Sequence, residues 1–166
     1  MDNKESPKDQ INSIIELFSS GQTQDALVDI ETLINDFPNE PLLFNFCGVF
    51  YKEIGQLDEA IKRFEKALAI NPEYAEAHNN LGVTLQNLGL MDEAVKSYEK
   101  ALALKPDYTE SHNNLGVTLQ NLGLMDEAVK SYEKAIAIKP DYAEGHNNLG
   151  NIFKELKQLD TAVNSY

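Results

Sequence analysis

The sequence predicts an all-α solenoid of stacked, antiparallel helix pairs. The first observation is a period, because the letters HNNLGVTLQNLGLMDEAVKSYEKA occur identically at 78–101 and 112–135, starting 34 residues apart. The second is the content of each copy, in which apolar residues recur at spacings of three and four, the spacing of one helix face. Helical units repeated at this period are typical of solenoids.

Charge and composition set the class of partner. The chain has 166 residues and a formal charge of −13, from 27 acidic and 14 basic residues. Such a chain repels phosphate backbones and anionic lipid surfaces. We therefore expect no nucleic acid and no membrane as partner, and a neutral or basic protein or peptide instead.

Location is predicted from the ends and the apolar content of the chain. No apolar run has the length of a membrane helix, and the opening letters MDNKESPKDQ lack the apolar segment of a secretory signal. The single cysteine, Cys47, agrees with a reducing compartment and is interpreted as a small packing residue. We expect a cytoplasmic protein.

Steps of 34 residues divide the chain into a tail and an array. The tail is 1–6, and the array at 7–166 has units at 7–40, 41–74, 75–108, 109–142 and 143–166, the last one incomplete. Residue 166 is expected inside the second helix of the fifth unit. Its apolar side, formed by Ala162, Val163 and Tyr166, is then open to a neighbour.

The third unit illustrates both helices of a pair. The first is predicted from Ala75 to Leu88 by its stripe of Ala77, Leu81, Leu85 and Leu88, and the second begins after Gly89 and ends before Pro106. Gly89 permits positive φ in the tight turn. Gly82 and Ala94 leave room for close helix approach, so we expect each pair to be antiparallel.

The residues that recur resemble the tetratricopeptide repeat. The carriers are Phe44, Cys47-Gly48, Tyr51, Ala60, Phe64 and Pro72 in the second unit, and Leu81-Gly82, Ala94, Tyr98 and Pro106 with their equivalents 34 residues later. The resemblance covers 7–166 and implies a right-handed superhelix of about four and a half repeats. His78, His112 and His146 replace the usual leading aromatic residue, and we expect their rings to fill the slot between paired helices.

Catalytic and metal sites are not indicated. Successive units lie roughly 10 Å apart, the scale of helix packing, so the three repeated histidines cannot converge on one metal ion. No serine or cysteine has a base at a recognisable spacing, and no glycine-rich phosphate loop occurs. We expect no enzyme activity, no cofactor and no metal.

Paired asparagines provide the candidate binding site. The resemblance implies that the first helix of each unit lines a concave face, and an amide offers both donors and an acceptor to the backbone of an extended peptide. The expected peptide-binding residues are Asn79, Asn80, Val83, Gln86, Asn87, Asn113, Asn114, Val117, Gln120, Asn121, Asn147, Asn148 and Asn151. Asn80, Asn114 and Asn148 resemble the asparagine row of O-linked N-acetylglucosamine transferase repeats, and Phe46 ends the row.

One subfamily is excluded by charge. Repeats that clamp carboxylate tails of chaperones place basic residues on this face, where this chain has Leu42, Glu76, Glu110 and Glu144, with only Lys8 basic. The predicted function is a protein–protein interaction scaffold. Two alternatives remain: a self-assembly element that associates end to end through its C-terminal helix, and a recruiting domain of a larger glycosyltransferase-, sulfotransferase- or methyltransferase-type enzyme.

Overall fold

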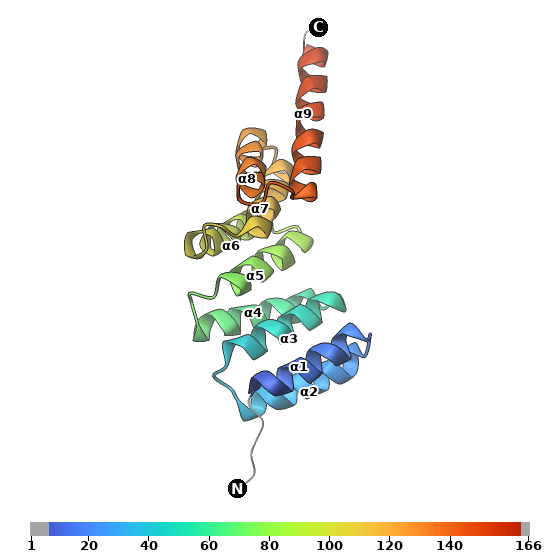
Figure 1. The fold of residues 1–166 in the computed structure, drawn as a ribbon, viewed down its shortest axis with the longest axis vertical. Helices are drawn as coiled ribbons and strands as arrows, with labels where there is room; N and C mark the ends of the chain where they lie inside the picture. Colours follow the sequence, from blue (N-terminus) through green and yellow to red (C-terminus); the bar gives the residue numbers. More distant parts are fainter. Residues whose placement is uncertain (1–6, 164–166) are drawn as a thin grey trace.

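The chain forms an elongated stack of helices, with α1 and α9 at opposite ends (Figure 1). The computed structural model describes the backbone of residues 7–163 and the side chains of residues 10–157. All regular elements in this part are helices: α1 (Pro7–Ser19), α2 (Thr23–Asp36), α3 (Pro41–Glu53), α4 (Leu57–Ile70), α5 (Ala75–Asn87), α6 (Met91–Leu104), α7 (Thr109–Asn121), α8 (Met125–Ile138) and α9 (Ala143–Val163). The predicted all-α solenoid is confirmed.

Short turns make the helices of each unit neighbours. Only three residues separate α5 from α6 and α7 from α8. Gly21, Gly55, Gly89 and Gly123 occupy the turns with φ between 78° and 83°, a conformation that side chains disfavour. Because so short a turn reverses the chain, the two helices of a unit run antiparallel, as the sequence predicts.

A second set of glycines lets the paired helices touch. A Cβ atom added at Gly82 would lie 2.7 Å from the Tyr98 ring, and one at Gly116 would lie 2.6 Å from the Tyr132 ring. Both rings are fully buried. The glycine of the first helix is therefore the floor on which the aromatic ring of the second helix rests.

The stack is curved because its two layers are spaced differently. Successive odd-numbered helices α3, α5, α7 and α9 contact one another across units, whereas the even-numbered helices α4, α6 and α8 pack chiefly on the odd-numbered helices beside them. The layer whose members approach more closely lies on the inside of the curve. The odd-numbered helices thus form the concave face, as expected for the first helix of each unit.

The fifth unit differs from its prediction. A turn and a second helix are expected after residue 156, but α9 continues as one helix through Val163. The physical reason is visible in the repeat register, because Lys157 occupies the position of the turn glycines Gly89 and Gly123. Lysine disfavours positive φ and favours a helix interior, so the helix propagates through this position.

The repeated histidines pack as expected in two of three units. The His78 and His112 side chains are buried, and each Nε2–H donates to a proline carbonyl, Pro72 at 3.0 Å and Pro106 at 2.9 Å. Burial lowers the pKa of both rings. His146 makes the same bond at 2.9 Å but is exposed.

Two further properties bear on function. Within the described residues, no group of three or more His, Cys, Asp or Glu side chains is placed to hold a metal ion. The helices in that same part of the chain are also too short or too polar for a bilayer crossing.

Candidate functional site: an amide-lined groove

Asparagine pairs connect the concave helices from unit to unit. The second asparagine of each unit donates its amide N–H to the side-chain oxygen of the first asparagine one unit earlier. The bonds join Asn80 to Asn45 (3.0 Å), Asn114 to Asn79 (3.4 Å) and Asn148 to Asn113 (3.0 Å). This amide chain runs along α3, α5, α7 and α9, and its direction is the same at every joint.

The amide chain corrects part of the predicted site. Asn79 is 6% exposed and Asn113 is fully buried, so neither can contact a peptide. Neighbouring residues of a helix point about 100° apart, and therefore only one asparagine of each pair faces the groove while the other faces the next helix. Asn147, at the equivalent position in α9, is exposed.

The groove-facing asparagines keep one polar atom for a ligand. Asn80, Asn114 and Asn148 are half-buried, and each uses its N–H in the amide chain. No other hydrogen bond among the described side chains uses their Oδ1 atoms. Since an amide oxygen accepts through two lone pairs, each unit presents a fixed acceptor.

The glutamines are oriented in the opposite sense. The Gln86 Oε1 atom accepts from the Tyr98 hydroxyl at 2.9 Å and from the Thr118 hydroxyl at 3.0 Å. Burial raises the pKa of Tyr98, so its hydroxyl remains a donor. With the oxygen held, the amide N–H₂ of Gln86 is the end left for the groove.

Gln120 repeats this arrangement with one difference. Its Oε1 accepts from the Tyr132 hydroxyl at 3.0 Å, and its Nε2 donates to the Glu155 carboxylate at 3.2 Å. Burial raises the pKa of Tyr132 to about 12, which keeps the phenol protonated. Glu155 therefore extends the polar surface from α7 onto α9.

A hollow of about 430 Å³ lies between α7 and α9 on this face. It brings together five predicted residues, Val117, Gln120, Asn121, Asn148 and Asn151. The sequence analysis missed three others in its lining, Tyr132, Lys154 and Glu155. Glu155 lies one helical turn beyond Asn151, and that spacing would have included it if the first helix of the fifth unit had been expected to extend past residue 156.

The remaining predicted residues follow the repeat. On α5, Val83 and Gln86 are half-buried and Asn87 is exposed. We call the surface of the exposed and half-buried predicted residues the amide groove: Asn80, Val83, Gln86 and Asn87 on α5, Asn114, Val117, Gln120 and Asn121 on α7, and Asn148 and Asn151 on α9. Phe46 occupies the equivalent position on α3 and packs against Phe50 at 6.4 Å between ring centroids, which ends the row as expected.

The proposed self-association residues cannot be placed. Ala162 and Val163 lie in the backbone of α9, but their side chains are outside the described residues. Tyr166 lies wholly outside them, and the Lys8 side chain does too.

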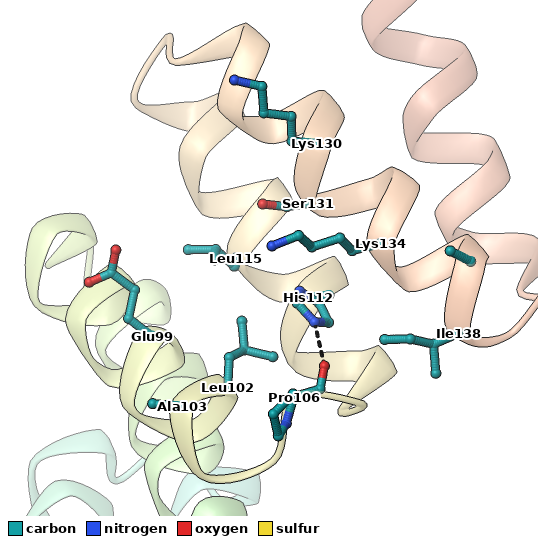
Figure 2. A pocket seen from close by; sticks show the side chains of 11 residues that line it. Glu99, Leu102, Ala103, Pro106, His112, Leu115, Lys130, Ser131, Lys134 and Ile138 are labelled. Carbon is teal, nitrogen blue, oxygen red and sulfur yellow. Dashed lines mark hydrogen bonds between the residues drawn. The ribbon is translucent and has the colours of Figure 1, made fainter.

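The convex face holds a feature that the sequence analysis did not predict. A hollow of about 590 Å³ lies between α6 and α8 above α7 (Figure 2). Leu102, Leu115 and Ile138 supply its apolar lining, and His112 lies at its base beside Pro106. Lys134 extends from α8 over the hollow. We call this the α6–α8 hollow.

Comparisons with known proteins agree with the repeat reading. The family model described as TPR repeat matches residues 48–89 and 125–157, and the model described as Tetratricopeptide repeat matches residues 73–140. Together they cover the chain from 48 to 157 without a gap. A search of curated proteins found no match.

Several solved structures share the fold. A crystal structure of MamA has 25% identity and a TM-score of 0.79, covering 90% of this chain and 87% of that one. YrrB, described as a TPR protein with an unusual peptide-binding site, has 25% identity and a TM-score of 0.73, with 93% and 80% covered.

The first TPR of Spaghetti (RPAP3), solved with the HSP90 peptide SRMEEVD, has 26% identity and a TM-score of 0.69, with 71% of this chain and 94% of that chain covered. The repeat family and its fold are generally non-catalytic interaction modules. These neighbours support a role as a protein-interaction scaffold.

Proposed function

We propose that this chain, which belongs to the tetratricopeptide repeat family, binds an extended segment of a partner protein in the amide groove and holds it through its backbone. The observation that carries the proposal is the amide chain. It fixes Asn80, Asn114 and Asn148 with the N–H used internally and the oxygen left over.

The groove offers what a peptide backbone lacks partners for. Each backbone residue has one N–H donor and one C=O acceptor. Asn114 and its equivalents supply acceptors, and Gln86 supplies a donor whose oxygen is already held by Tyr98 and Thr118. Since the network fixes these amides before a ligand arrives, binding costs little side-chain entropy.

The spacing of the units also suits an extended ligand. A strand advances about 3.3 Å per residue, so one unit of roughly 10 Å corresponds to about three peptide residues. Equal amides at each unit then contact every third peptide bond and read the backbone rather than its side chains. The net charge of −13 favours a neutral or basic segment.

A simple alanine scan would confuse binding with stability. Removing only Asn114 leaves the buried Asn79 oxygen without a donor, and an unsatisfied buried polar group costs about 1–3 kcal/mol. Removing both partners avoids this penalty. The informative pair is therefore Asn79→Ala, which keeps the groove amide, and Asn79→Ala/Asn114→Ala, which removes it.

The probe is a set of peptides selected from a displayed random library on the unaltered chain. We expect Asn79→Ala to bind them with unchanged affinity and the double variant to lose about threefold to tenfold, the effect of one hydrogen bond. N-methylation of peptide amides at every third position should weaken binding as well. Equal affinity for both variants, with equal helical content by circular dichroism, contradicts the proposal.

A further inference from the structure

The convex face carries two hollows that are copies of each other. The second lies between α4 and α6, measures about 340 Å³ and is called the α4–α6 hollow. Its leucines, Leu68 and Leu81, are equivalent by one unit to Leu102 and Leu115 in the α6–α8 hollow. His78 and Pro72 likewise stand where His112 and Pro106 do. An apolar floor is thus presented twice, one unit apart.

Each hollow has charged rims that do not neutralise each other. Lys96 and Lys100 line the α4–α6 hollow from α6, and Lys130 and Lys134 line the α6–α8 hollow from α8. These four lysines are exposed, and none belongs to an ion pair among the described residues. In a chain of net charge −13, unpaired lysines grouped around apolar floors are a local exception.

The joint one unit earlier shows that such hollows are not imposed by the repeat. There Phe44, 5% exposed, stands where the other units have histidine. Arg63 stands at the position of Ser97 and pairs with Glu31 at 2.6 Å. Glu31 is equivalent to the rim residues Glu65 and Glu99, so this ion pair joins the two rims. The first joint is closed, and the two later joints keep equivalent charges apart.

We propose that the two convex hollows together bind an acidic amphipathic helix of a partner protein, with one apolar side chain in each hollow and carboxylates on the four lysines. Successive units lie roughly 10 Å apart, and a helix rises about 1.5 Å per residue. Apolar anchors seven residues apart therefore match the two hollows. Each anchor has an acidic residue three or four positions onward to meet the lysines.

The rims also set the direction of the ligand. Glu65 and Glu99 line the α1-proximal side of the two hollows, opposite the lysines. A carboxylate placed on that side meets like charge and is disfavoured. The acidic residues must therefore follow each anchor toward the α9 end of the stack, which gives the bound helix one orientation.

The probe is a fluorescein-labelled synthetic helix with leucines seven residues apart, each followed four residues later by glutamate, on an alanine and glutamine background. We expect saturable binding by fluorescence anisotropy, weakened by added salt. The matched peptide with lysine in place of each glutamate should bind at least about tenfold more weakly. Absence of binding by the glutamate peptide, or equal binding of both, overturns the proposal.

The repeat supplies a control variant at equivalent positions. Lys62 and Lys66 on α4 correspond to Lys130 and Lys134 but adjoin the closed joint. Lys130→Gln/Lys134→Gln should weaken the glutamate peptide about threefold to tenfold, the effect of two rim charges, while Lys62→Gln/Lys66→Gln leaves it within twofold. Equal losses in the two double variants would show a general charge effect and refute the site.

Two further arms separate other occupants and the groove. Vesicles containing phosphatidylserine should not sediment the chain, and sedimentation that depends on Lys130 and Lys134 would assign the lysines to a lipid surface instead. The Asn79→Ala/Asn114→Ala variant should bind the glutamate peptide normally, because its changes lie on the concave face. A parallel loss there would place this peptide in the amide groove and overturn the convex assignment.

Discussion

The same substitution at two equivalent glycines is predicted to have opposite effects on stability. In Gly116→Ala, the added Cβ lies 2.6 Å from one Tyr132 ring carbon and 2.7 Å from the next, where ordinary carbon contacts are about 3.5–4.0 Å. The ring is fully buried and its hydroxyl is bound to Gln120, so it has no free direction in which to move. In Gly150→Ala, by contrast, nothing lies within 4 Å.

The magnitudes follow from these contacts. Overpacking costs about 1–3 kcal/mol, loss of the tyrosine hydrogen bond costs about 1 kcal/mol, and replacing glycine by alanine within a helix returns about 1 kcal/mol. Gly116→Ala should therefore lower the free energy of unfolding by about 1–3 kcal/mol. Gly150→Ala has only the helix term and should stabilise α9 by up to about 1 kcal/mol.

The assay combines urea unfolding, followed by circular dichroism, with hydrogen exchange resolved by unit, because repeat arrays can unfold in parts. The result that refutes the reasoning is destabilisation by Gly150→Ala comparable to that by Gly116→Ala. It would mean that an aromatic ring rests on Gly150 as one does on Gly116. A folded-back second helix carrying Tyr166 would provide that ring, and the single-helix account of α9 would be wrong.

Two other predictions concern buried polar groups. Ser111→Ala should raise the free energy of unfolding by about 1–2 kcal/mol, because the buried Ser111 hydroxyl has no partner and Ala77 already occupies the equivalent site; a loss on thermal or urea unfolding would show that the hydroxyl is bonded. The pKa of His78 and His112 is lowered below 6.5 by burial, so unfolded chains bind more protons as pH falls. The stabilising contribution is complete above pH 6.5 and is lost as pH falls through the folded-state pKa. Urea titrations should give lower stability at about pH 5 than at pH 7.5, with a smaller difference in a variant carrying glutamine at both positions; an unchanged difference would assign the effect to carboxylates.

The sequence predicted the helix pairs because their determinants are local. Gly89 and Gly123 mark turns that only positive φ can close, and Gly82 leaves room that its neighbour Tyr98 fills. These features repeat with the period, so one unit predicts the others. Lys157 was also visible in the sequence, and its consequence for α9 follows from the same glycine rule applied to the fifth unit.

The site was predicted less well because it depends on the curvature of the stack. The 100° between adjacent helix positions shows that Asn79 and Asn80 cannot both face the groove, but the choice between them depends on where the next helix lies. The tyrosine and threonine hydroxyls that orient Gln86 come from α6 and α7, beyond local pattern. The convex hollows are spaces between even-numbered helices, and their size follows from how far the layers diverge.

The uniform joint between units has a consequence for how such a chain changes over generations. The Asn114 to Asn79 bond and the Asn148 to Asn113 bond have the same donors and acceptors, so the product of a gene duplication of 34 codons meets its neighbours through contacts already tested elsewhere in the molecule. Insertions of any other length would misalign both ends at once. Length is thus a heritable variable that selection can adjust in whole steps, each one adding about three residues to the reach of the protein without redesigning a single interface.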